Sequence, residues 1–121
     1  MNGANSFAYQ CIVGSGERAK AVVPTATNKV MEDGELVMIG IAPRINGYAG
    51  TMGDILPVNG KYTPRQKDLI NHLRETLRLT KAMLKPGMCG REIDVPGRKY
   101  YEKHGLAQYI VCPFAHSIGL M

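Results

Sequence analysis

The stretch "DGELVMIGIAPRINGYAGTMGDILPV" (residues 33–58) decides the fold of this chain. After a turn signal at its start, residues 35–43 are nearly all apolar, which is typical of a strand covered on both faces. The Asn46-Gly47 pair is a strong hairpin signal, because both residues tolerate the positive φ angles of a tight turn. Residues 51–58 are therefore predicted to return as an antiparallel strand.

Two further strands are predicted on either side of this hairpin. Residues 7–13, "FAYQCIV", form a short run that favours β structure and ends at the glycine-flanked turn "GSGE" (14–17). Towards the other end of the sequence, "QYIVCPF" (108–114) has the same character. The sequence thus predicts a first strand, a central hairpin and a final strand.

The clearest helix lies between the hairpin and the final strand. It begins with Thr63 as N-cap and Pro64 at the first helical position, and it runs to about Leu84, where "KPG" stops it. We expect its apolar stripe to pack on the sheet. The members of this stripe recur at helical spacing: Leu69, Ile70, Leu73, Leu77, Met83 and Leu84.

A second, shorter helix is predicted from near Asp94, with Pro96 in its first turn, to Gly105. In chain order the elements are a strand, a hairpin, two helices and a strand. This order indicates an α+β fold in which helices cover one face of a mainly antiparallel sheet. The length of 121 residues corresponds to a single domain.

The composition narrows the class of protein. With 45% apolar and 21% charged residues, the chain has the composition of a globular domain. Its three cysteines, Cys11, Cys89 and Cys112, show neither a CxxC motif nor metal-type spacing, which favours a reducing, cytoplasmic environment. The longest apolar run, 36–43, is too short to cross a bilayer, and the N-terminus lacks the pattern of a secretory leader. We therefore expect a soluble protein without membrane contact.

The formal net charge of +5 raises the question of an anionic partner. Much of the positive charge lies in residues 61–85, where Asp68 and Glu75 stand in helical register with some of the basic residues. Such an arrangement is typical of a solvated helix face. Aromatic residues are not interleaved with the basic ones as a stacking platform for nucleic acid requires, so nucleic-acid binding is not expected.

Four segments, taken in order, resemble the pita-bread fold family that includes methionine aminopeptidase, Xaa-Pro dipeptidase, aminopeptidase P and creatinase. The resemblance implies that residues 1–121 form the N-terminal half of a catalytic domain of this kind. The segments are "IVGSGERA" (12–19), "DGELVMIGIAPRINGYAG" (33–50), "LKPGMCGREID" (84–94) with "GRKYYEKHGL" (97–106), and "PFAHSIGL" (113–120).

In the metal-dependent members of this family, the hairpin carries two aspartates that bridge two divalent ions. Hard oxygen ligands hold such cations and allow them to activate the water between them. Aligned on Gly47-Tyr48, the two aspartates fall on Gly40 and Thr51 in this sequence. Asp54 lies three residues beyond the second position, and odd spacing in a strand directs it to the other face. The resemblance therefore implies a degenerate metal site, and no cofactor is expected.

Within the family, the chain is most similar to the creatinase-like branch. The similarity lies in the pattern Pro-x-Ile-x-Gly-Tyr at 43–48 and in "FAHSIG" at 114–119. Creatinase-like members hydrolyse a C–N bond without a metal and use a histidine as general base. An ungapped match places Val23 where that base would be, and Gly53 where a substrate-binding glutamate would be.

His116 matches a histidine that is a metal ligand in metal-dependent relatives and that faces the substrate in creatinase-like ones. The resemblance thus implies a catalytic role for His116, with Tyr48 and Phe114 as substrate-binding residues. From the residues alone, a packed, hydrogen-bonded histidine is the alternative for His116. A tyrosine in a hairpin can likewise serve packing at the rim.

Two classes of function follow from these observations. The first is a hydrolase of C–N bonds in small amino-acid-like or dipeptide substrates, in which His116 polarises the substrate or carries its proton. The base would then come from outside the chain or from an unrecognised residue. The alternative is a pita-bread scaffold that has lost its ligands and binds proteins or small molecules.

The chain by itself is expected to be inactive and to associate. A half domain leaves the apolar faces of residues 36–43 and 64–84 without their usual cover. We therefore expect self-association, or association with the missing second half of the domain.

Overall fold

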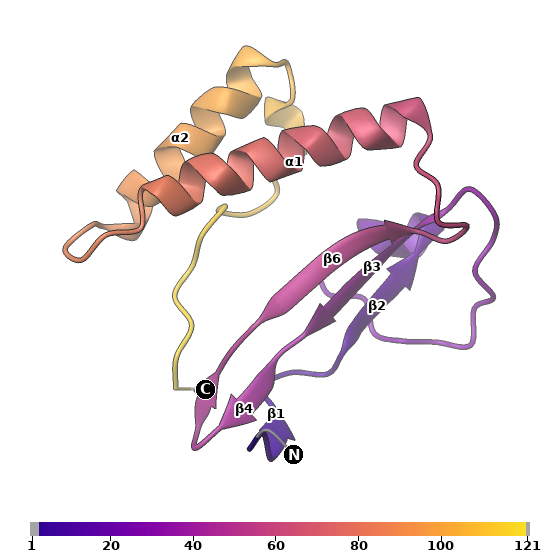
Figure 1. Cartoon of the computed structure of the whole chain (residues 1–121), viewed down its shortest axis with the longest axis horizontal. Helices are drawn as coiled ribbons and strands as arrows, with labels where there is room; N and C mark the ends of the chain where they lie inside the picture. The colour runs from indigo at the N-terminus through magenta and orange to yellow at the C-terminus, as the bar shows by residue number, and fades with distance from the viewer. Residues whose placement is uncertain (1–2, 121) are drawn as a thin grey trace. The chain divides into compact units, whose positions relative to one another are not determined.

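The computed structural model describes residues 3–120. The chain folds into two compact units: the first comprises the residues up to Gln66 and the segment from Ile118 onward, and the second comprises Lys67–Ser117. Figure 1 shows the strands in indigo to magenta and the two longer helices in red to orange. None of the helices among residues 3–120 combines the length and the apolar character that crossing a membrane requires.

A three-stranded antiparallel sheet forms the body of the first unit (Figure 1). Its strands are β2 (Ile12–Ser15), β3 (Leu36–Ile41) and β6 (Met52–Pro57), in the order β2-β3-β6. The strand with the most continuous apolar sequence, β3, is the central one. Its antiparallel pairing with β6 confirms the predicted return of the hairpin.

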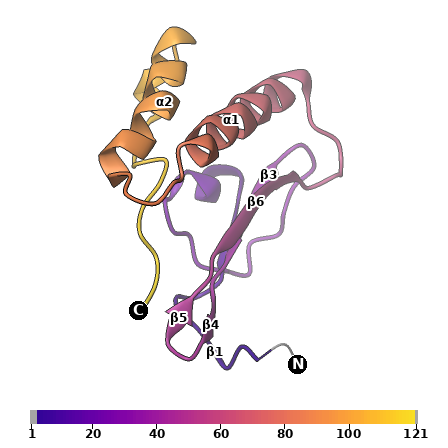
Figure 2. The same cartoon turned by 60° about the vertical axis from the view of Figure 1, so that its left-hand side comes forward.

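A smaller sheet lies at the tip of the hairpin (Figure 2). It contains β1 (Ser6–Phe7), β4 (Pro43–Ile45) and β5 (Tyr48–Ala49), in the order β1-β4-β5. Between β4 and β5, Asn46 and Gly47 have φ angles of 50° and 83°. Two successive positive φ angles are the mark of a tight hairpin turn, so the turn predicted from this pair is confirmed.

The predicted first strand, residues 7–13, is divided in two by the structure. The strand β1 ends at Phe7, and β2 begins at Ile12. The register explains the break, because residues 8–11 lie opposite residues 41–42 alone. The extra length on one side interrupts the ladder as a bulge does.

The turn predicted at residues 14–17 begins later than expected. The strand β2 continues to Ser15, and the short 3₁₀ helix η1 (Gly16–Lys20) follows it. Gly16 has a φ angle of 55°, and a Cβ atom there would lie 2.1 Å from Glu35 Oε1. Glycine is favoured at this exit from the sheet, because it adopts this conformation without strain and leaves the Glu35 carboxylate in place.

The prediction that residues 35–43 are covered on both faces is wrong for part of the run. Val37 and Ala42 are buried, with 7% and 1% of their surface exposed, but Ile39 and Ile41 are each 40% exposed. The apolar side chains of this run are therefore only partly buried among residues 3–120.

The helix α1 (Pro64–Ala82) begins at the predicted N-cap. Thr63 Oγ1 accepts the Gln66 N–H at 3.3 Å, and Gln66 Oε1 accepts the Thr63 N–H at 2.8 Å. This reciprocal pair is a capping box, which satisfies two N–H groups that the helix itself leaves without partners. The predicted start of the helix is confirmed.

The predicted apolar stripe of α1 is only partly buried. Leu73, Leu77 and Leu84 are 40%, 53% and 59% exposed. The buried residues of the helix are Ile70, which belongs to the stripe, and Thr76 and Thr80, which do not. The expectation that all the stripe residues lie in a core is therefore confirmed for Ile70 and wrong for these three leucines.

The helix α2 (Gly90–Lys103) begins one turn before the predicted start at Asp94. Cys89 is its N-cap residue, and the Cys89 N–H donates to Glu92 Oε2 at 2.9 Å. Pro96 consequently lies inside the helix, where it leaves out one backbone hydrogen bond. The prediction assigned Pro96 to the first turn, and this assignment placed the start too late.

The end of α2 agrees with the prediction. Gly105, with a φ angle of 67°, follows the C-cap residue His104. The Gly105 N–H donates to the Glu102 carbonyl, and the Leu106 N–H donates to the Tyr101 carbonyl. This pair of bonds is a Schellman motif, in which glycine is favoured at the left-handed position.

The predicted final strand, residues 108–114, is absent. Ala107–Tyr109 forms a 3₁₀ turn, η2, and residues 110–119 contain neither helix nor strand. The Phe114 N–H donates to Asp94 Oδ1 at 2.6 Å and not to a neighbouring strand. The β preference of the segment therefore yields to a tertiary contact.

Candidate functional site

The hairpin positions that bear on metal binding lie on both faces of the larger sheet. In the β3–β6 register, Gly40 is paired with Gly53, and Ile39 is paired with Asp54. Because alternate residues of a strand share a face, Thr51 falls on the side of Gly40 and Gly53, and Asp54 falls on the opposite side. The predicted orientation of Asp54 is thus confirmed by the register.

The chain's own N-terminal segment occupies the space beside Gly40 and Thr51. A Cβ atom on Gly40 would lie 3.1 Å from Ile12 Cβ and 3.2 Å from Ile12 Cδ1. The Thr51 hydroxyl lies 2.6 Å from the Tyr9 hydroxyl, so the two share a hydrogen bond. The contacts of Ile12 with Gly40 and of Tyr9 with Thr51 could not be predicted from the sequence, because they follow from the strand register.

The two hairpin positions on this face offer no carboxylate. Gly40 has no side chain, and the Thr51 oxygen is a neutral hydroxyl that is already hydrogen-bonded. Divalent ions of this kind need several converging oxygen or imidazole ligands. Among residues 3–120, no group of three or more histidine, cysteine, aspartate or glutamate side chains is arranged to hold a metal ion.

Tyr48 lies in β5, where it is paired with Ile45 and is 61% exposed. The end of the "FAHSIGL" motif runs along the same strand. Leu120 forms an isolated antiparallel bridge with Tyr48, and the Ala49 N–H donates to the Gly119 carbonyl at 2.9 Å. Tyr48 is therefore an exposed residue on a strand that is paired on both sides.

His116 is exposed, in a segment without regular structure. Its Nδ1 atom lies 3.0 Å from the Ser117 carbonyl oxygen. A carbonyl oxygen can only accept, so Nδ1 donates and the neutral ring keeps Nε2 as an acceptor. His116 is therefore exposed among residues 3–120, and in this tautomer Nε2 is the ring atom that can accept a hydrogen bond.

Phe114 is half-buried within the second unit. Its ring meets the Tyr101 ring edge to face, with centroids 5.0 Å apart and planes at 78°. The same ring covers Gly97, where a Cβ atom would lie 2.7 Å from Phe114 Cδ2. The structure therefore places Phe114 in side-chain packing, and its predicted role in substrate binding stays a prediction.

Asp94 is the polar residue that sequence reasoning missed in this region. It is 7% exposed, and its carboxylate accepts both the Phe114 N–H and the Arg98 Nε–H. The spacing of Asp94 and Arg98 is that of an i,i+4 ion pair and could be recognised in the sequence. The contact with Phe114 joins residues twenty positions apart, and no local sequence pattern indicates it.

The positions that match the creatinase-like base and glutamate supply no catalytic group. Val23 is 59% exposed, and its side chain is apolar. Gly53 faces the backbone of β3, where a Cβ atom would lie 3.2 Å from the Ile39 carbonyl oxygen. Val23 therefore supplies no base, and Gly53 supplies no substrate-binding carboxylate.

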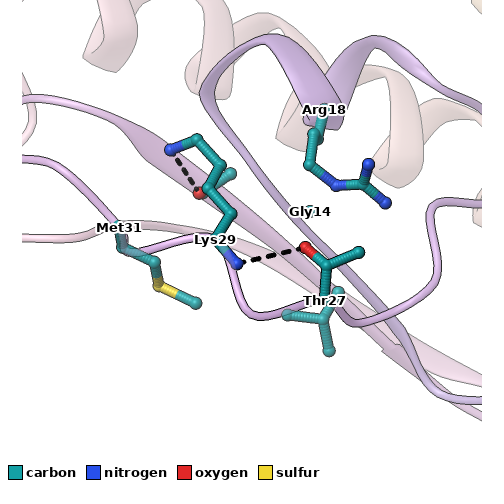
Figure 3. Close-up of a pocket in the computed structure, with 7 residues that line it drawn as sticks. Gly14, Arg18, Thr27, Lys29 and Met31 are labelled. Carbon is teal, nitrogen blue, oxygen red and sulfur yellow. Dashed lines mark hydrogen bonds between the residues drawn. The ribbon is translucent and has the colours of Figure 1, made fainter.

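The lining of a small pocket beside β2 includes the charged side chains of Arg18 and Lys29 (Figure 3). Both are already paired with other groups of the chain. Lys29 Nζ donates to both Glu35 carboxylate oxygens, at 2.9 and 2.8 Å, and Arg18 donates to the Thr25 carbonyl at 3.1 Å. The hydrogen bond from Lys29, followed by that from the Glu32 N–H, lowers the pKa of Glu35. These contacts fix the loop that precedes β3.

The sequence matches a known family along its whole length. The model of metallopeptidase family M24 matches residues 1–121. The Xaa-Pro dipeptidase of Pyrococcus furiosus is 28% identical over 120 residues, which are 99% of this chain and 34% of that protein. The Xaa-Pro aminopeptidase of Escherichia coli is 36% identical over 92 residues, which are 76% of this chain and 21% of that protein. The chain thus spans about a third or less of the length of these relatives.

Solved structures match the fold of this chain over almost its whole length. The prolidase of Pyrococcus furiosus has a TM-score of 0.90 and 28% identity, covering 98% of this chain and 35% of its own. The Xaa-Pro dipeptidase of Bacillus anthracis has a TM-score of 0.88 and 30% identity, covering 98% and 33%. The predicted pita-bread fold, with antiparallel sheets and two helices, is confirmed for the portion that this chain represents.

Proposed function

The chain belongs to metallopeptidase family M24, and on that basis we propose that it supplies the first part of the catalytic domain of a hydrolase. The substrates are small amino-acid-like molecules or dipeptides, in which a C–N bond is cleaved by water. The relatives named Xaa-Pro dipeptidase and Xaa-Pro aminopeptidase support this assignment. The exposed imidazole of His116, within the "FAHSIG" motif, is the single observation that carries it.

In this proposal the metal site of the family is degenerate. The support comes from Gly40 and Thr51, which share a face of the sheet but offer no carboxylate, while Asp54 lies on the opposite face. Ile12 lies in tight contact with the place of a Cβ atom at Gly40, 3.1 Å from it. The residues of this chain therefore act without a two-metal centre built on the hairpin.

His116 polarises the substrate or carries its proton at Nε2. Its Nδ1 donates to the Ser117 carbonyl, which fixes the tautomer that leaves Nε2 as an acceptor. Tyr48 and Phe114 contact the substrate. Val23 offers no base, so the group that activates water comes from outside these 121 residues or from another residue within them, and the chain alone is expected to be inactive.

The alternative proposal is a non-catalytic scaffold that binds a protein or a small molecule. The same loss of carboxylates at Gly40 and Thr51 favours it, because binding needs neither a metal nor a base. The two proposals differ in the ligand they require. A hydrolase descended from Xaa-Pro peptidases should recognise the order of residues in a dipeptide, whereas a general scaffold has no reason to do so.

Amide NMR titration of the 121-residue chain tests the proposal. We expect Ala-Pro to shift the amide signals of His116 and Tyr48, and the reversed dipeptide Pro-Ala to leave them in place. His116→Ala should abolish the response, and His104→Ala is the matched control, because His104 is also exposed but lies at the end of α2. Equal responses to both dipeptides, or none to either, would contradict the hydrolase assignment.

A further inference from the structure

The buried carboxylate of Asp94, on α2, accepts hydrogen bonds from two partners. Asp94 is 7% exposed, and a charge so withdrawn from water is costly unless both oxygens are hydrogen-bonded. Oδ2 accepts from Arg98 Nε, one helical turn further along, and Oδ1 accepts the Phe114 N–H at 2.6 Å. The second bond reaches a segment without regular structure, so Asp94 ties the helix to the chain that leads to His116.

That segment has few other attachments of its backbone. Among the backbone N–H groups of residues 111–117, that of Phe114 alone is hydrogen-bonded within the part of the chain that the structure describes, and the Ser117 carbonyl accepts only from the neighbouring His116 side chain. Pro113, directly before it, has no N–H to offer. A charge-assisted hydrogen bond from a carboxylate to a backbone N–H is about twice as strong as a neutral one. Asp94 is therefore the main polar anchor of this stretch.

The Phe114 side chain is held by the same face of α2. Asp94, Gly97 and Tyr101 are spaced at i, i+3 and i+7, which places them side by side along the helix. Gly97 leaves room for the Phe114 ring, since a Cβ atom would lie 2.7 Å from Cδ2 and 3.1 Å from Cγ. Tyr101 closes the seat by an edge-to-face contact at 5.0 Å.

We propose that Asp94, together with Gly97 and Tyr101, positions His116 by seating Phe114. His116 is two positions after Phe114, so its α-carbon lies at most about 7 Å from the seated one. Asp94 does not touch the substrate and is a positioning residue. The inference rests on the proposed function, because it concerns the imidazole that the proposal places in the active site.

The test compares variants that separate the hydrogen bond to Phe114 from the ion pair with Arg98. Asp94→Ala removes both. The double variant Asp94→Asn with Arg98→Met keeps an amide oxygen for the Phe114 N–H and removes the ion pair. Gly97→Ala leaves the carboxylate intact and displaces the ring. Glu102→Gln, an exposed carboxylate change on the same helix, is the matched control.

Backbone ¹⁵N relaxation at residues 114–116 and titration with Ala-Pro are the two measurements. In the wild type and in Glu102→Gln we expect order parameters near those of α2, about 0.85. In Asp94→Ala and Gly97→Ala they should fall below about 0.6, and Ala-Pro should bind about tenfold more weakly. The double variant should keep the wild-type order at His116, which an ion-pair role for Asp94 does not predict.

The outcomes separate this inference from the proposed function. If residues 114–116 stay ordered in Asp94→Ala and Gly97→Ala while Ala-Pro still binds, the positioning role is wrong and the proposed function stands. If order is lost as expected but Ala-Pro never bound the wild type, the seat is real and the proposed function fails. Should Asp94→Ala not fold, Gly97→Ala and the double variant decide the question, because they retain an acceptor for the Phe114 N–H.

Discussion

The two glycines of α2 stand in different surroundings. A Cβ atom at Gly90 would meet nothing within 4 Å, whereas one at Gly97 would press on the Phe114 ring. Alanine is ordinarily better than glycine inside a helix by about 1 kcal/mol. We expect Gly90→Ala to leave the free energy of unfolding unchanged or slightly raised, and Gly97→Ala to lower it by about 1–3 kcal/mol, because the ring must move. Urea unfolding of both variants measures the difference. Equal stability would mean that Phe114 is not held on the helix.

The chain is predicted to bind no stoichiometric divalent metal. Gly40 and Thr51 offer no carboxylate, and Ile12 occupies the space beside Gly40. After dialysis against manganese, cobalt or zinc, elemental analysis should find far less than one ion per chain. A dialysed His116→Ala sample is the control for adventitious binding by the exposed imidazole. About one ion or more per wild-type chain would overturn the prediction.

Single residues were predictable where a local rule governs them. The orientation of Asp54 followed from the period of two along a strand, which the backbone imposes whatever the sequence around it. The roles of Asp94 and Tyr9 could not be foreseen, because their partners, Phe114 and Thr51, lie far away in the sequence. The helical and strand periodicities of the sequence do not indicate contacts between residues so far apart. The exposure of His116 was equally beyond reach, since burial depends on the completed fold.

At the scale of elements, the loop before β3 depends on one carboxylate. The Lys29 ammonium and the Glu32 N–H lower the pKa of Glu35 in the folded chain. A lowered folded pKa means that the stabilisation is complete above the unfolded pKa of about 4.3 and is lost as the pH falls through the folded value. We therefore expect the wild type to lose stability on acidification more steeply than Lys29→Met does.

Urea unfolding between about pH 3 and pH 6 measures this difference, because the window contains the titration of the unfolded carboxyl group. Lys20→Met is the control, since the pair between Lys20 and Glu17 is largely solvated, with side chains 73% and 84% exposed. Parallel pH profiles for the wild type and Lys29→Met would show that the pair does not hold the loop.

Elements with strong terminal signals were predicted more accurately than those that depend on a partner. The Asn46-Gly47 turn and the Thr63 cap are local, and both are present as predicted. The final strand was predicted from β-favouring residues alone, but a strand needs a neighbour, and residues 110–119 have none along most of their length. The start of α2 was misplaced because cysteine is an uncommon N-cap, so Pro96 was the more visible signal.

For the whole molecule, the exposed apolar side chains predict association. The first unit exposes Ile39, Ile41 and Met52, and the second exposes Leu73 and Leu77. We expect light scattering to show a mass that rises with concentration, because such surface gains free energy when it leaves water. Leu77→Lys should reduce the association, whereas Arg74→Lys, a change of charged residue on the same helix, should not. A monomer at all concentrations would contradict the prediction.

The bridge between Tyr48 and Leu120 also bears on the order in which the chain folds. The β3–β6 hairpin joins residues close in sequence, and such hairpins form within about 1–10 μs. The bridge must close a loop that contains both helices, and the entropy cost of closure grows with loop length. We therefore expect β5 to form with the hairpin, before Leu120 pairs with it. Residues 119–120 then join the small sheet late in folding.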